Sequence, residues 1–255
     1  MPKANVPVLK EPKPKKKGSR KVALILFLLV FILLCVLFFR SSLSKISEIS
    51  FAGNTYITDD ELIEISGLKE GAPFFGTSSS GIEARLSGIE SVENVTVNKT
   101  FPGKIEIIVK EYPVVAYELS SDGSLNGMLA NGTKIALKNG SMPIAKPILT
   151  GWSADDPMLS KLCGTLAQIP DSLVSEISEI TPSPTLSYPD RIKMYTRSHF
   201  EIITAISVLP DKAEYMNLIM DSQDPGTLTL LEADTYTPYI SSESGSEAEN
   251  DTTHE

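Results

Sequence analysis

The sequence predicts an α+β fold: a single transmembrane helix, then a small β-α-α-β-β domain, then a mixed, mostly antiparallel β domain with a few helices. Three observations predict it. Residues 22–39 are all apolar. Residues 46–113 contain strand and helix patterns in the order strand, helix, helix, strand, strand, and turn dipeptides recur through residues 114–240. The part of the 255-residue chain that follows the apolar run is long enough for one or two modest hydrophobic cores.

The apolar run of residues 22–39 has the length of a membrane span. Its eighteen residues would reach roughly 27 Å as a helix, close to the ~30 Å hydrocarbon core of a bilayer. Basic residues crowd the preceding segment, and only Arg40 and Lys45 follow closely. Because basic flanks stay in the cytoplasm, we expect a type II anchor with the N-terminus inside and the bulk of the chain outside.

A cleaved signal peptide is the alternative interpretation of this run. The apolar core of a signal peptide is typically about 7–15 residues long and ends at a small-residue cleavage site. Here the run is longer, and Phe38-Phe39-Arg40 follows where small residues would be needed; Ser42-Leu43-Ser44 is a weak candidate for cleavage. We therefore favour an uncleaved membrane anchor.

The two ends of the chain have compositions that cannot form a core. Residues 1–21 hold eight basic residues and one acid, with four prolines, and predict a disordered cytoplasmic tail that is attracted to anionic lipid headgroups. Residues 241–255 hold five acids and no Lys or Arg, and predict a disordered acidic tail.

Charge and cysteine usage exclude some classes of function. The total charge is −9, and because residues 1–21 carry +7, the rest of the chain carries −16. A region this acidic is a poor nucleic-acid binder. Cys35 lies in the apolar run and Cys163 far outside it, so an intrachain disulfide is not expected.

The first strand and helix of the 46–113 unit are marked by a turn and a cap. Residues 46–51 predict a short strand with apolar side chains on one face, and Gly53-Asn54 is the turn that closes it. Thr58 precedes Glu61 by three residues, which is the spacing of a helix capping box. Gly67 is expected to end this helix.

A second helix and a hairpin complete the unit. Ser80 precedes Glu83 by three residues, so the capping spacing repeats. Pro102-Gly103 is a strong turn signal, and the strand after it alternates apolar and polar positions. The order strand, helix, helix, strand, strand predicts two helices that cover one face of a three-stranded sheet.

Strands dominate the prediction for residues 114–240. Turns are expected at four dipeptides: Asp122-Gly123, Asn126-Gly127, Asn131-Gly132 and Asn139-Gly140. Strands are expected at residues 192–196, 200–203 and 227–231, and helices at 157–169 and 209–220. Residues 173–180 fit either a strand or a helix.

The sequence lacks the usual marks of catalysis. It has no Cys/His pair at metal-ligand spacing, no Gly-rich phosphate loop and no nucleophile elbow. Cys163, His199 and Arg197 could in principle form a transpeptidase trio. However, Cys163 lies among aliphatic residues in a predicted helix, which favours a buried structural thiol, and His199 is expected in a strand. We expect no enzyme activity and no catalytic, cofactor or metal site.

Several motifs resemble a known family. The element order of residues 46–113 resembles a POTRA domain, and the residues resemble the FtsQ/DivIB cell-division proteins over about residues 15–240. The matching motifs are Ile49-Ser50-Phe51-Ala52-Gly53-Asn54, Phe74-Phe75, Thr100-Phe101-Pro102-Gly103, Tyr188-Pro189-Asp190-Arg191, Pro225-Gly226-Thr227-Leu228 and Tyr236-Thr237-Pro238-Tyr239. The family often carries Glu-Arg-x-Pro after its last POTRA strand, whereas this chain has Glu111-Tyr112-Pro113.

The resemblance implies a scaffold of the division machinery. Such a protein would bind FtsL-type and DivIC/FtsB-type single-pass proteins at the division septum and act with septal peptidoglycan synthesis. Binding would occur by addition of a strand to a free sheet edge. The implied partner-binding residues are Thr227, Leu228, Thr229, Leu230, Leu231, Tyr236 and Tyr239. A charged residue at position 230 is then expected to weaken capture without unfolding the domain.

Two other classes remain open at this point. A POTRA-bearing export or assembly factor would bind client polypeptides, but such proteins favour several POTRA copies or a β-barrel. An anchored cell-wall enzyme would turn over wall precursors.

Overall fold

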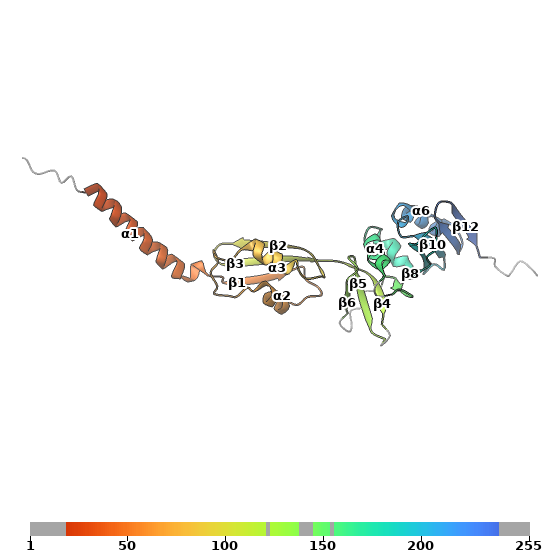
Figure 1. Cartoon of the computed structure of the whole chain (residues 1–255), viewed down its shortest axis with the longest axis horizontal. Coiled ribbons are helices and arrows are strands. Elements are labelled where there is room, and N and C mark those ends of the chain that lie inside the picture. The colour runs from red at the N-terminus through yellow and green to blue at the C-terminus, as the bar shows by residue number, and fades with distance from the viewer. Residues whose placement is uncertain (1–18, 121–122, 138–144, 154–155, 240–255) are drawn as a thin grey trace, which may run out of the picture. The chain divides into compact units, whose positions relative to one another are not determined.

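The computed structural model describes residues 19–120, 123–137, 145–153 and 156–239, which form two compact units (Figure 1). The first unit comprises residues 1–86 with 95–109, and the second comprises residues 87–94 with 110–255. Most of the basic tail, all of the acidic tail and the Asn139-Gly140 turn lie outside the described residues.

The apolar run forms one long helix. This helix, α1 (Ser19–Arg40), starts three residues before the apolar run and is followed by the short 3-10 helix η1 (Ser42–Ser44). Within the described part of the chain, it is the one helix long and apolar enough to cross a membrane, and its side chains are not buried by the protein. The predicted N-terminal apolar helix is confirmed.

The segment after η1, most of which lies in the first unit, has the predicted β-α-α-β-β order. Its elements are β1 (Glu48–Ala52), α2 (Asp59–Ser66), α3 (Ser79–Leu86), β2 (Val92–Thr100) and β3 (Lys104–Glu111). The strand order is β1-β3-β2, and β1 is parallel to β3. Leu62 and Ile82 from the helices and Ile105 and Ile107 from β3 are essentially fully buried, so the apolar faces meet in one core.

One of the two predicted helix caps is confirmed. Thr58 accepts a hydrogen bond from the Glu61 amide while the Glu61 carboxylate accepts from the Thr58 amide, and Gly67 ends the helix at φ +66°. The second prediction is wrong. Because α3 begins at Ser79, Ser78 accepts from the Gly81 amide and Glu83 instead accepts from the Val97 amide of β2.

The second unit is built on a nine-stranded mixed sheet. Its strands are β4 (Val114–Leu119), β5 (Leu125–Leu129), β6 (Lys134–Ala136), β7 (Ile148–Leu149), β8 (Ile177–Pro182), β9 (Arg191–Thr196), β10 (Glu201–Ala205), β11 (Gly226–Leu230) and β12 (Asp234–Pro238). They are ordered β12-β11-β10-β9-β8-β7-β4-β5-β6. Three neighbouring pairs are parallel and the others antiparallel, as predicted for a mostly antiparallel domain.

Three helices complete the core of this unit. They are α4 (Pro157–Leu166), α5 (Asp171–Glu176) and α6 (Leu209–Ser222). Leu162 of α4, Leu173 of α5 and Met216 of α6 are buried in the same cluster as Ile202 of β10 and Leu228 of β11. The helices therefore bury one face of the strands.

Several sequence predictions for this unit are corrected or made specific by the structure. Residues 173–180 divide between α5 and β8, and the helix that begins at Pro157 ends at Leu166. The expected Asn126-Gly127 turn lies inside β5, where a side chain on Gly127 would approach Val114, Leu137 and Ile135 at 3.1–3.3 Å. His199 lies in a turn at φ +66°, not in a strand.

Candidate partner-binding strand

Strand β12 is a free edge of the nine-stranded sheet. In the part of the chain that the structure describes, β12 lies at one end of the strand order and β6 at the other. Four of its five residues are exposed, and only Tyr236 is half-buried. An exposed edge strand presents backbone groups that another chain can bind.

The register identifies the backbone groups that face outward. β12 pairs antiparallel with β11, Tyr236 lies opposite Leu228, and the Tyr239 amide donates to the Pro225 carbonyl at 3.1 Å. Hydrogen-bonded and non-hydrogen-bonded pairs alternate along an antiparallel ladder. The amides of Asp234 and Tyr236 therefore point away from β11. Pro238 is on the same outward side, where a missing N–H removes no bond to the sheet.

β11 supports this edge from the interior of the domain. Leu228 and Leu230 are fully buried in the core cluster. The Thr204 hydroxyl, also fully buried, donates to the Leu230 carbonyl at 2.8 Å. Alternate residues of β11 thus fix the strand against the helices, while Thr227 and Thr229 lie on the opposite face of the sheet.

Side-chain contacts hold β12 at its first and middle residues. Lys212 of α6 forms an ion pair with Asp234 at 2.6 Å, and both side chains are about a quarter exposed. The Tyr236 hydroxyl donates to the Asp224 carbonyl at 2.6 Å, and its ring centroid lies 6.5 Å from that of Phe200. The edge strand is consequently an ordered surface on which a partner strand could align.

The face of the sheet opposite the helices is polar beside this edge. Thr237 pairs with Thr227 and Thr235 with Thr229, so four threonines form two adjacent cross-strand pairs. On the neighbouring strands, Lys193 forms an ion pair with Glu201 at 2.7 Å. All of these side chains are exposed or half-buried, so an added strand would meet a polar, open face.

The seven residues expected to bind a partner differ in how far their side chains are exposed. Leu228 and Leu230 are buried, while Thr227, Thr229, Leu231 and Tyr236 are half-buried and Tyr239 is 51% exposed. Because Leu230 has no exposed surface, a charge at position 230 is expected to disturb the fold as well as any contact with a partner, contrary to the expectation from the sequence. The described structure offers the backbone of β12 for contact.

The sequence motifs do not predict a strand at β12, although Tyr236-Thr237-Pro238-Tyr239 is one of the matching motifs. Asp234 and Thr235 are not among the expected partner-binding residues, although Thr235-Tyr236-Thr237 is a run of residues that favour strands, ended by a proline. A five-residue strand gives little periodicity, so the signal is short.

The candidate catalytic trio is not supported by the environment of its cysteine. Cys163 is fully buried in α4, and this burial raises the pKa of the thiol to about 12. His199 is exposed, and the Arg197 guanidinium donates to the Ser175 carbonyl at 2.7 Å. Among the described residues, no group of three His, Cys, Asp or Glu side chains is placed to hold a metal ion.

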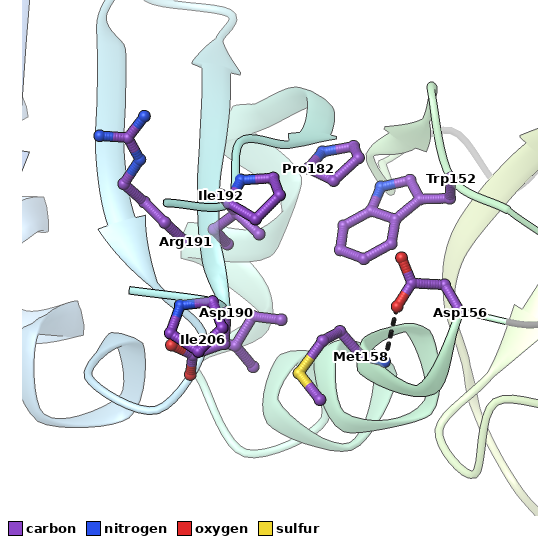
Figure 2. Close-up of a pocket in the computed structure, with 10 residues that line it drawn as sticks. Trp152, Asp156, Met158, Pro182, Asp190, Arg191, Ile192 and Ile206 are labelled. Atoms are coloured by element: carbon purple, nitrogen blue, oxygen red, sulfur yellow. Dashed lines mark hydrogen bonds between the residues drawn. The ribbon is translucent and has the colours of Figure 1, made fainter. Parts of the chain in front are cut away.

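A small pocket of the second unit opens beside Trp152 (Figure 2). Its polar groups are already paired: the Trp152 indole donates to the Ile180 carbonyl at 3.1 Å, and Asp156 accepts from the Met158 amide at 2.9 Å. Arg191 donates to the Ser183 carbonyl at 2.7 Å and points away from the tryptophan (Figure 2). The hydrogen bonds of these groups support the local structure.

Comparisons with known proteins agree with this architecture. Residues 44–112 match the family described as POTRA domain, FtsQ-type. A cell division protein DivIB from Paenibacillus polymyxa (strain E681) is 52% identical, with 99% of this chain and 100% of that protein covered. A DivIB from Bacillus anthracis is 32% identical, with 93% and 91% covered.

A solved structure is also similar in part. It is the major extracytoplasmic domain of the trans isomer of DivIB from Geobacillus stearothermophilus, at 28% identity and a TM-score of 0.37, with 43% of this chain and 92% of that chain covered. The similarity to whole DivIB proteins along nearly the full chain shows that this protein belongs to the DivIB family of cell division proteins.

Proposed function

We propose that this division protein is a non-enzymatic scaffold that binds FtsL-type and DivIC/FtsB-type partners through strand addition at β12. The exposed backbone edge of β12 is the observation that carries the proposal. A scaffold needs an accessible, ordered surface, and β12 is fixed by Lys212, Phe200 and the β11 ladder. Strand addition uses main-chain hydrogen bonds for affinity and alternate side chains for specificity.

The proposal includes a type II orientation and enrichment at the division septum. The excess of basic residues before α1 favours a cytoplasmic N-terminus, so both units would lie outside the membrane. Partners that are themselves single-pass proteins would meet β12 on that side. The acidic outer part of the chain would stay soluble beside the wall.

A pair of substitutions at one position tests strand addition. Tyr236→Ala and Tyr236→Pro both remove the ring near Phe200 and the hydroxyl bond to Asp224. Only the proline also removes the outward amide and places a ring where the added strand would lie. We expect Tyr236→Pro to bind the DivIC-type partner at least about tenfold more weakly than Tyr236→Ala, since lost hydrogen bonds and a steric block act together.

The measurement is titration of the full-length chain, reconstituted in nanodiscs, with the purified partner. Circular dichroism must show that the two variants keep the same secondary structure and a similar midpoint of unfolding. Equal affinity of two folded variants would contradict binding at this edge.

A further inference from the structure

Exposed aromatic side chains form a cluster where α1 meets the rest of the first unit. The ring centroid of Phe75 lies 5.9 Å from that of Phe38, 6.2 Å from that of Phe39 and 6.1 Å from that of Phe101. Phe75 and Phe101 are each 54% exposed. These two residues, called here the aromatic tip, belong to the loops before α3 and between β2 and β3.

Backbone contacts fix the tip to the end of α1. The buried Ser44 hydroxyl donates to the Phe39 carbonyl at 2.8 Å, while the Ser44 carbonyl accepts from the Phe74 amide at 2.9 Å. Lys45 forms a β-bridge with Pro73. No free linker therefore separates the last turn of the helix from the loop that carries Phe75.

A glycine fixes the second loop of the tip in the same way. Gly103 has φ +71°, and a side chain there would come within 2.4 Å of the Lys45 carbonyl. The turn that carries Phe101 is therefore packed directly on the segment that follows η1. The Ser47 amide donates to the Gly103 carbonyl at 2.8 Å and holds this contact.

The loop turns one phenylalanine inward and the next outward. Phe74 is 5% exposed, and the Lys99 ammonium lies 4.5 Å from its ring centroid. Lys99 also donates to the carbonyls of Phe74 and Thr77 at 2.6 and 2.7 Å. The core thus uses Phe74, whereas the exposed ring of Phe75 is available to something outside the protein.

The length of α1 indicates what covers the tip. Its 22 residues span about 33 Å, slightly more than the ~30 Å hydrocarbon core. Phe38 and Phe39 in the last turn, followed by Arg40, therefore lie where the hydrocarbon core meets the headgroups, a depth that apolar rings at a membrane surface can reach. Because Phe75 contacts both rings, it lies at the same depth.

We propose that Phe75 and Phe101 insert into the outer headgroup region of the phospholipid bilayer and anchor the first unit to the membrane surface. The occupant is lipid because the cluster is continuous with the rings of the membrane-spanning helix. Basic side chains at the same level, Arg40 and Lys45, are exposed and can meet the lipid phosphates. The domain would then sit on the membrane in one orientation.

The test uses the full chain in nanodiscs whose lipids carry bromine near the headgroup end of the acyl chains, which quenches indole fluorescence. Phe75→Trp and Phe101→Trp place the reporter in the tip. Ile108→Trp is the matched control, since Ile108 is 41% exposed on β3, five residues beyond Gly103 and so about 17 Å farther along the strand. The signal of the unsubstituted chain, which contains Trp152, is subtracted.

We expect brominated lipid to cause loss of fluorescence from both tip reporters and not from the control. Two separate positions keep the test valid if one variant misfolds, which circular dichroism would reveal. Tip reporters that are quenched no more than the Ile108→Trp control would overturn the proposal. Partner affinity at β12 is a separate measurement, so failure here leaves the proposed function standing.

Discussion

At the residue scale, Leu230 belongs to the core beneath the proposed binding edge and not to the edge itself. It is fully buried in the core, whereas its neighbour Thr229 is half-buried on the polar face. We expect Leu230→Ala to lower the free energy of unfolding of the second unit by about 2–5 kcal/mol, the range for buried Leu truncations. Leu230→Asp should lower it further, because an unpaired charge would be buried.

Urea denaturation followed by circular dichroism measures this effect. Thr229→Asp is the matched control, and its stability should fall far less because its side chain can reach water. If Leu230→Asp unfolded no more readily than Thr229→Asp, the result would contradict the burial of the Leu230 side chain in the core. Loss of partner binding by a variant at position 230 would therefore report on folding rather than on contact.

At the element scale, Asp190 joins three segments of the second unit. Its carboxylate accepts from Lys161 of α4 and from the Ser207 amide before α6, both at 3.0 Å, and its side chain is 12% exposed. Burial raises the pKa of Asp190, but hydrogen bonds from Ser207 and Lys161 and the charge of Lys161 outweigh it, so the pKa is below its usual value.

The lowered pKa of Asp190 makes a pH-dependent contribution to stability. The carboxylate stabilises the fold above the unfolded-state pKa of about 3.9, and this contribution is lost as the pH falls through the lower folded-state pKa. We expect Asp190→Asn to lower the free energy of unfolding by about 1 kcal/mol at pH 7, with a difference that disappears in strong acid. Urea titrations across pH measure it.

Asp171→Asn is the control for this prediction. The hydrogen bond and charge of Lys146 also lower the pKa of Asp171, but its side chain is 93% exposed, so solvent screens the pair. We expect almost no change in stability for that variant. A loss at position 190 that stayed constant from neutral pH into strong acid would contradict a role of the carboxylate charge.

The elements also show what could be predicted from sequence. The Thr58 capping box and the Gly67 helix end depend on local spacing, and both are confirmed. The spacing of Ser80 and Glu83 predicted a capping box that is not formed, and α3 begins at Ser79 instead. The Glu83 carboxylate accepts a hydrogen bond from the distant Val97 amide, a contact that no local pattern reveals. For the same reason, the exposed position of β12 depends on strand order, which non-local pairing decides.

For the candidate site too, the local pattern predicts a strand but not its position in the sheet. Alternation alone placed Thr227 and Leu230 in a strand, and the structure has them in β11. Alternation does not distinguish a central strand from an edge strand, since both have side chains on two faces. The outward amides of Asp234 and Tyr236 became apparent only from the register between β11 and β12.

At the scale of the whole molecule, the proposed function needs both the membrane helix and the β12 edge. An anchor alone would leave the protein spread over the membrane, whereas partners held at the septum would concentrate it there. We expect a fluorescent fusion to the N-terminus of the full chain to gather at mid-cell during septation. Tyr236→Pro should reduce this enrichment more than Tyr236→Ala, because only the proline removes the outward amide of β12.

Quantitative microscopy of strains with matched expression measures the ratio of mid-cell to lateral membrane signal. Immunoblotting controls for the amount of protein, and the membrane signal itself shows that α1 still inserts. A uniform distribution of the unsubstituted fusion would contradict septal recruitment. Equal enrichment of the two variants would instead show that recruitment does not depend on the outward amide of β12, and another surface of the chain would then have to meet the partners at the septum.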